Sequence, residues 1–214
     1  YIFPQSIGPF NYRLRDKIFL SPIFLKSCLG YPEIIFAREE SGLRELNRLG
    51  NKNAVTGYDI VLKAQEYNLF SIYRQKPNLK YIKINPSSVG IIPNIKVIEG
   101  VANPNKIYSI YESLIKYLIS TNRKVYILRH SYEDLSICQA INNIFPQDEM
   151  IELIADDLNT FELQNIIAQF EFIISSRYHS IIHAYNNNVP ALVIGWAEKY
   201  CELVSKNKGK YGIV

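Results

Sequence analysis

The segment Ser175-Ser176-Arg177-Tyr178-His179-Ser180 concentrates the side chains best suited to chemistry. An apolar run ends at Ile174 and a helical pattern follows, so the segment is expected to join a strand to a helix with serines at the N-cap. A helix N-terminus attracts anions, Arg177 adds a forked donor for a carboxylate or phosphate, and His179 adds a titratable ring. We weigh anion binding equally against an ordinary salt bridge of Arg177 and a helix cap by His179.

Two other cations are expected where strands end. Arg38 follows the apolar run 33–37 and precedes Glu39 and Glu40, so it either pairs with these acids or faces a ligand. Lys199 begins the last expected helix, and its ammonium either reaches a cleft or stays solvated. The sequence leaves both alternatives open at each position.

The chain has three histidines, all in its second half. His130 follows the run 124–129, and Asp134 comes four residues later. Either this pair lines the cleft, or Asp134 caps the next helix while His130 is satisfied locally. His179 and His183 have a spacing that can hold a metal, but two ligands do not make a site and we predict none. We expect His183 to face the core.

Two further features are less specific. The stretch Gln5-Ser6-Ile7-Gly8-Pro9-Phe10 predicts a turn, because Gly and Pro are adjacent in it. Trp196, the only tryptophan, is expected either to pack at the end of a strand or to give a sugar a platform for stacking. Neither feature identifies a function on its own.

Strand-like and helical patterns alternate along the chain, which is typical of βαβ units around a parallel sheet. The second half predicts strands over 88–92, 124–129, 150–154, 172–175 and 191–195, and helices over 105–121, 134–144, 159–169, 178–187 and 198–206. The first half predicts strands over 1–4 and 33–37, a short strand or turn within 54–61, and helices over 15–29 and 39–49. Ligands bind beyond the carboxyl ends of parallel strands, which is where the cations named above are expected.

The pattern weakens over 63–85, where polar residues and Pro77 alternate with few apolar pairs. We therefore expect a domain boundary near residue 80. Residues 1–80 then form a partial N-terminal Rossmann-like domain and a linker. Residues 81–214 form a C-terminal Rossmann-like domain, which contains the helix N-terminus after Ile174.

The composition is that of a globular chain of 214 residues, with 48% hydrophobic residues, 21% charged residues and a formal net charge of +4. These values exclude a disordered or collagen-like chain. The positive charge is spread along the sequence, so no nucleic-acid partner is expected. No apolar run approaches the ~20 residues that a membrane helix needs. Three widely spaced cysteines fit a reducing compartment.

Several pieces of the chain occur in a familiar order: Pro4-Gln5-Ser6-Ile7-Gly8-Pro9-Phe10, Ala37-Arg38-Glu39-Glu40-Ser41, Asp59, Ser176-Arg177-Tyr178-His179-Ser180-Ile181-Ile182-His183-Ala184, Val189-Pro190-Ala191-Leu192 and Lys199. This ordered set, which spans nearly the whole chain, resembles the polysaccharide pyruvyl transferase family. The resemblance implies an α/β fold with two Rossmann-like domains in a glycosyltransferase-B-like arrangement, the first of them incomplete here. It also implies transfer of the enolpyruvyl carbons of phosphoenolpyruvate to two hydroxyls of a sugar, which forms a pyruvate ketal on a cell-surface polysaccharide.

The resemblance further implies roles for individual residues. Three residues match the family's contacts to the donor: Arg38 in the first domain, and Arg177 and His179 in the second. These three side chains are therefore expected to converge. Tyr178 stands where the family more often has Leu. The expected catalytic residues are His179 and Arg177, and the expected substrate-binding residues are Arg38, Arg177, Tyr178, His179, Ser6, Gly8, His130 and Lys199.

This interpretation involves no metal and no cofactor, with phosphoenolpyruvate as the donor substrate and a sugar or polysaccharide, free or lipid-linked, as the acceptor. The expected location is cytoplasmic, including the inner face of the membrane as a peripheral protein. Arg177→Ala and His179→Ala are each expected to abolish transfer and to leave the fold intact.

Two alternatives remain open. One is a nucleotide-sugar-dependent glycosyltransferase of the same fold, in which Glu198 is the convenient acid for a ribose. The other is a non-catalytic domain that binds a glycan or an anion and releases no phosphate from the donor. A shared fold does not decide between these functions.

Overall fold

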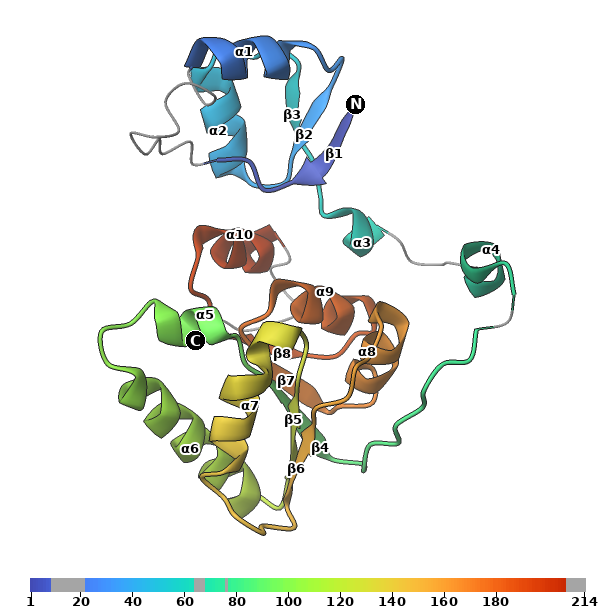
Figure 1. Ribbon diagram of the computed structural model, residues 1–214, viewed down its shortest axis with the longest axis vertical. Helices are drawn as coiled ribbons and strands as arrows, with labels where there is room; N and C mark the ends of the chain where they lie inside the picture. The colour runs from blue at the N-terminus through green and yellow to red at the C-terminus, as the bar shows by residue number, and fades with distance from the viewer. Residues whose placement is uncertain (9–21, 64–67, 76, 207–214) are drawn as a thin grey trace. The chain divides into compact units, whose positions relative to one another are not determined.

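The computed structural model describes residues 1–8, 22–63, 68–75 and 77–206. The chain divides into two compact units, Tyr1–Tyr67 and Asn68–Val214, and each contains one parallel sheet (Figure 1). Pro9 and Phe10 of the first matching piece, and the expected helical residues 15–21, lie outside the described residues.

The division after Tyr67 precedes the expected boundary near residue 80. The segment between them contains a short helix, α4 (Leu69–Tyr73), which the sequence pattern did not reveal. Side chains of the second unit hold the chain that follows: the Lys80 N–H donates to Glu162 at 2.6 Å, and the Ile84 N–H donates to Gln169 at 3.0 Å. These long-range bonds explain why the segment belongs with the second unit.

The first unit is a three-stranded sheet in the order β1-β2-β3, with all strands parallel. Its elements are β1 (Ile2–Gln5), α1 (Pro22–Gly30), β2 (Ile35–Ala37), α2 (Glu40–Arg48), β3 (Ala54–Thr56) and α3 (Ile60–Lys63). Ile35, Ala37 and Leu46 are fully buried and form its core. Since the strands are parallel, the residues that follow them gather at one edge of the sheet.

The second unit is a five-stranded sheet in the order β6-β5-β4-β7-β8, again with all strands parallel. Its strands are β4 (Ser88–Ile92), β5 (Lys124–Leu128), β6 (Ile151–Ile154), β7 (Phe172–Ser175) and β8 (Ala191–Val193). All five residues of β4, the central strand, are buried. The direction in which strands are added reverses between β4 and β7, which creates the crevice where doubly wound sheets bind ligands.

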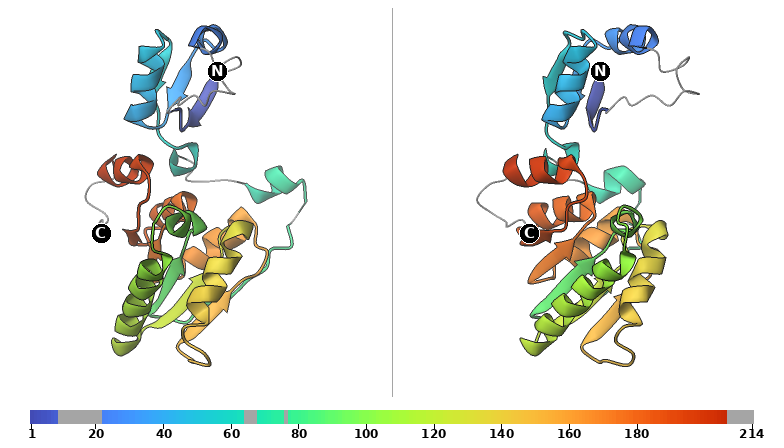
Figure 2. Two further views of the ribbon diagram at one scale, coloured as in Figure 1. Left: turned by 60° about the vertical axis from the view of Figure 1, so that its left-hand side comes forward. Right: turned by 90° about the vertical axis from the view of Figure 1, so that its left-hand side faces the viewer.

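Helices cover both faces of this sheet. They are α5 (Ile95–Glu99), α6 (Pro104–Ser120), α7 (Leu135–Asn142), α8 (Thr160–Ile167), α9 (Tyr178–Asn186) and α10 (Glu198–Lys206), with a 3₁₀ turn over Tyr132–Asp134. The pair α6 and α7 packs on one face and the pair α8 and α9 on the other (Figure 2). These bounds confirm the predicted alternation of strands and helices. The pattern missed α5, since five residues are too short to show a helical period.

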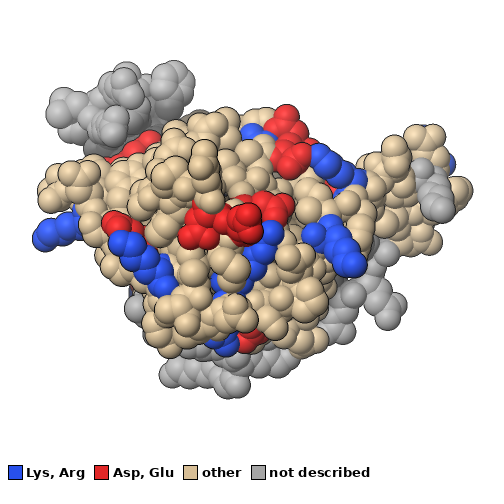
Figure 3. Space-filling model, turned by 90° about the horizontal axis from the view of Figure 1, so that it is seen from below, with Lys and Arg blue, Asp and Glu red and all other residues tan. Residues whose placement is uncertain are grey.

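The mixed charges of the surface and the free cysteines are as expected from the sequence composition. Basic and acidic side chains lie interspersed on the face at the amino ends of the strands (Figure 3), where Arg123 pairs with Glu171. Cys28, Cys138 and Cys201 are free thiols. None of the described helices is long and apolar enough to span a bilayer.

Candidate active site

The N-terminus of α9 lies at the carboxyl end of β7, the strand that pairs with the central strand β4. The N-cap is Arg177, so the expectation of a serine N-cap is wrong. Ser175 lies two residues before the N-cap, and its hydroxyl accepts the Arg177 N–H at 2.9 Å. The Ser180 hydroxyl donates to the Arg177 carbonyl at 2.7 Å. These bonds fix the turn, and the first N–H groups of a helix have no partner within it.

Arg177 forms the salt bridge that the sequence left as one of two alternatives. Its Nε donates to Asp134 Oδ2 at 2.6 Å, and its Nη2 donates to Asp134 Oδ1 and Glu133 Oε1, each at 2.5 Å. The Arg177 guanidinium holds the pKa of Glu133 below its usual value. No described residue accepts a hydrogen bond from Arg177 Nη1. Arg177 therefore keeps one donor edge for a ligand.

Asp134 has neither of the roles considered for it. Its side chain makes no capping bond to α7 and instead accepts from Arg177 and from the Ile95 N–H at 3.0 Å. It thus joins the turn after β4 to the turn after β7, with no exposed surface of its own. The sequence missed this role, because the partner Arg177 is 43 residues away.

His130 is not satisfied locally, which corrects that alternative. Its Nε2 is buried, and no described residue is hydrogen-bonded to it. The ring lies 6.3 Å from that of His183 on α9, and His183 is buried as expected. Burial lowers the pKa of His130 to about 3, and the nearby His183 and Arg177 add to this shift. His130 is therefore a neutral imidazole at physiological pH.

Lys199 lies against aromatic rings rather than in open solvent. Its Nζ is 5.5 Å from the centroid of the Tyr178 ring, 5.3 Å from that of Trp196 and 5.5 Å from that of Tyr200. The Tyr200 hydroxyl donates to the Ser176 carbonyl at 2.7 Å, which ties α10 to the turn before α9. Cation–π attraction then holds the Lys199 ammonium beside the α9 N-terminus.

His179 is exposed and does not cap α9. Its ring contacts that of Tyr178 edge-on, with centroids 5.6 Å apart. Tyr178 is buried, and its ring contacts both Lys199 and His179. Arg177, Tyr178, His179 and Lys199 thus form one group within the second unit, which we call the α9 cluster.

The first unit brings three of the matching pieces together at the carboxyl ends of its strands. Arg38 donates from Nε to Glu39 at 2.7 Å, from Nη1 to Asp59 at 2.8 Å and from Nη2 to Ser6 at 2.5 Å. The Ser6 hydroxyl donates to Glu39 at 2.9 Å. Glu39 and Asp59 are buried. Of the two alternatives for Arg38, the structure shows pairing with acids. Gly8 has a φ of 75°, the left-handed region that favours glycine.

The expected convergence would bring Arg38 of the first unit together with Arg177 and His179 of the second, and each unit is described on its own. It stays a prediction. Within each unit, the expected residues do come together: Ser6 with Arg38 in the first, and Lys199, Tyr178 and His179 in the second.

A family model described as polysaccharide pyruvyl transferase matches residues 1–198. The chain belongs to the polysaccharide pyruvyl transferase family. The hydrogen bonds of Arg38 in the first unit and the α9 cluster in the second are both formed by the pieces that carried the resemblance. Lys199 of the α9 cluster lies just beyond the residues that the family model matches. No curated protein matches the chain in sequence.

Among solved structures, this pyruvyl transferase family member resembles UDP-GlcNAc 2-epimerases. The Methanocaldococcus jannaschii enzyme, in complex with UDP-GlcNAc and UDP, aligns over 92% of this chain and 62% of its own, with a TM-score of 0.61 and 11% identity. The UDP co-structure of S. aureus MnaA aligns over 100% of this chain and 56% of its own, with a TM-score of 0.61 and 14% identity. At such identities the likeness shows the fold, which is α/β and glycosyltransferase-B-like. The chain spans less than two thirds of the length of either protein.

Proposed function

We propose that the protein transfers the enolpyruvyl carbons of phosphoenolpyruvate to two hydroxyls of a sugar in a cell-surface polysaccharide, forming a pyruvate ketal. The observation that carries the proposal is the α9 cluster: an ammonium, a guanidinium edge and an exposed imidazole meet at a helix N-terminus that follows β7, at the point where the strand order reverses. Such a site favours a small ligand with several negative charges. Phosphoenolpyruvate, which bears a phosphate and a carboxylate, is of this class.

The reaction needs one proton donor and stabilisation of a leaving phosphate. Protonation of C3 of the enol gives a methyl group and leaves C2 oxocarbenium-like, and the oxygen of one sugar hydroxyl attacks C2 while its proton passes to the phosphate group that will leave. Phosphate then leaves, and the second hydroxyl closes the ring with loss of its proton. A positioned acid contributes about 10²–10⁴-fold. His179 is the proposed protonated group, which either delivers the proton or holds the phosphate. Lys199 and the α9 N-terminus neutralise the phosphate as it departs.

Arg38 is proposed as a second contact for the donor. Its three nitrogens already bind Glu39, Asp59 and Ser6, so ligand binding would exchange one of these partners. Ser6 is the weakest of them, because a hydroxyl carries no charge. We propose that the reaction uses no metal or organic cofactor. The protein is proposed to be cytoplasmic, and its acceptor to be either free or lipid-linked.

A second candidate is a nucleotide-sugar-dependent glycosyltransferase, because the similar epimerase structures are bound to UDP or UDP-GlcNAc. The two candidates differ in their ligands. Under the first proposal, phosphoenolpyruvate raises the melting temperature and UDP-GlcNAc does not. Protection by UDP-GlcNAc alone would favour the second candidate.

The decisive experiment is phosphate release from phosphoenolpyruvate across a panel of acceptor glycans. We expect acceptor-dependent release by the wild type and a loss of at least ~100-fold in His179→Ala. His179 is exposed, so this variant should keep the wild-type melting temperature. Lys116→Met, on the outer face of α6, serves as a surface control with unchanged turnover. Equal turnover in His179→Ala and wild type would contradict the assignment of His179.

A further inference from the structure

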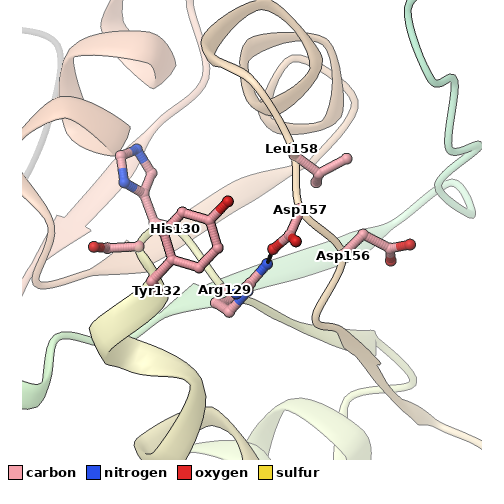
Figure 4. A pocket seen from close by; sticks show the side chains of 7 residues that line it. Arg129, His130, Tyr132, Asp156, Asp157 and Leu158 are labelled. Atoms are coloured by element: carbon pink, nitrogen blue, oxygen red, sulfur yellow. Dashed lines mark hydrogen bonds and ion pairs between the residues drawn. The ribbon is translucent and has the colours of Figure 1, made fainter.

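A pocket lies at the carboxyl ends of β5 and β6, outside the α9 cluster. It is a small opening of about 50 Å³, lined by Arg129, His130, Tyr132, Asp156, Asp157 and Leu158 among others (Figure 4). We propose that this pocket binds the acceptor through one neutral sugar ring, an inference that rests on the proposed function. Sequence analysis singled out only His130 of these residues, although two consecutive acids after a strand were a usable signal.

The aromatic wall of the pocket is exposed and held in place. Tyr132 is 77% exposed, and the Arg129 guanidinium lies 5.1 Å from the centroid of its ring. Arg129 is itself nearly buried and donates from Nη2 to Asp157. Figure 4 shows the Tyr132 ring beside Arg129 and the bond from Arg129 to Asp157. A tyrosine ring has an apolar face and a solvated hydroxyl, and such a ring suits stacking against the C–H face of a sugar.

The acids supply acceptors for hydroxyl groups. The Asp157 side chain is 68% exposed and that of Asp156 is 38% exposed. Lys80 pairs with Asp156 and holds the pKa of that carboxyl below its usual value, so the acid stays ionised. A carboxylate has about four lone-pair sites, so each acid retains acceptor capacity beyond its ion pair. Neighbouring hydroxyls of a sugar are donors of the matching kind.

The charge balance of the pocket favours a neutral ligand over a phosphate. Arg129 is paired with Asp157, and Lys80 with Asp156, so the charges of the two ion pairs cancel and leave no net positive charge to favour an anion. The α9 cluster, in contrast, combines the Lys199 ammonium with the exposed His179 imidazole at a helix N-terminus. The same chemistry of neighbouring hydroxyls occurs in the ribose of a nucleotide, but the nucleotide would bring its phosphates to these two acids.

His130 lies between the pocket and the buried side of α9. Its backbone follows Arg129 at the end of β5, while its ring points away from Asp156 and Asp157 and approaches His183 of α9 (Figure 4). A sugar seated on Tyr132 would therefore lie on the same edge of the sheet as the α9 cluster, two strands away along the order β5-β4-β7. This placement fits an acceptor subsite beside a donor subsite.

The test is saturation-transfer NMR on the full chain with methyl glycosides of galactose, glucose and mannose, in the absence of phosphoenolpyruvate. We expect at least one glycoside to bind, with affinity about tenfold weaker in Tyr132→Ala and in the isosteric Asp157→Asn. Tyr117→Ala is the matched control, because Tyr117 is 65% exposed on α6, outside both sites. Affinity for phosphoenolpyruvate should be equal in all four proteins.

Three outcomes would overturn the inference: no glycoside binds the wild type, Tyr132→Ala binds glycosides as the wild type does, or Tyr132→Ala loses binding of UDP and not of glycosides. Because glycoside binding is measured without the donor, it does not depend on turnover. Conversely, phosphate release with an unchanged acceptor KM in Tyr132→Ala would remove the sugar pocket and leave the proposed function standing.

Discussion

Arg177 and Asp134 form a two-point ion pair, in which Nε donates to Oδ2 at 2.6 Å and Nη2 to Oδ1 at 2.5 Å. The Asp134 side chain has no exposed surface, whereas 17% of the Arg177 side chain is exposed. One edge of the guanidinium thus anchors the start of α9 to the turn after β5. The pair fixes the orientation of Arg177 before any ligand binds.

The pair predicts that Arg177→Ala destabilises the second unit by about 3 kcal/mol, because it leaves a buried carboxylate without its partner. This revises the sequence-based expectation of an intact fold. Urea unfolding measures the loss, and the double variant Arg177→Met/Asp134→Asn should recover part of it. Arg48→Ala breaks only an exposed ion pair with Glu45 and should cost less than about 1 kcal/mol. Wild-type stability in Arg177→Ala would refute the structural role of the pair.

Lys199 provides the test of donor affinity. Lys199→Met should weaken binding of phosphoenolpyruvate by about tenfold, since it removes one cation from the α9 cluster. Methionine packs well against aromatic rings, so the melting temperature should change little. Isothermal titration at two salt concentrations gives the affinities, and the difference should shrink at high salt. The control Lys116→Met removes an exposed ammonium that pairs with Glu112 and should bind as the wild type does. Equal affinity in Lys199→Met and wild type would exclude Lys199 from the donor site.

The buried His130 predicts acid sensitivity of the fold. Its pKa is lowered from 6.5 to about 3, so the unfolded chain binds a proton between these values and the folded chain does not. The stability that a neutral His130 contributes is therefore lost as the pH falls below 6.5. Between pH 7.5 and 5.5 this loss is about 1.4 kcal/mol.

The comparison is between wild type and His130→Gln, each unfolded in urea at pH 7.5 and at pH 5.5. The variant has no imidazole at this position, so its stability should fall by about 1.4 kcal/mol less over the same interval. Parallel losses in the two proteins would show that His130 is protonated in the folded chain.

The regular elements could be predicted from the sequence because their periodicity is local. Strands such as β4 and β5 are mainly apolar after their first residue, and α6 extends over several turns. Short helices could not be predicted from the periodicity. The helices α4 and α5 have five residues each, and side-chain caps by Asn68 and Asn94 stabilise them.

The site could be predicted only as a set of candidates. The residue types at the end of β7 and at Lys199 indicated an anion site, and the structure places them together. Pairing of Arg38 with Glu39 was one expected alternative. The long-range partners of the two arginines could not be foreseen, because Asp59 is 21 residues from Arg38 and Asp134 is 43 residues from Arg177. Such contacts depend on strand order, which no local pattern contains.

The most direct test of donor binding at α9 is a titration of isotope-labelled protein with phosphoenolpyruvate, followed by backbone amide NMR. The account predicts saturable shifts of the Tyr178, His179 and Ser180 amides, with the signals of α6 unmoved. Shifts confined to other parts of the chain, or none at saturating phosphoenolpyruvate, would contradict it.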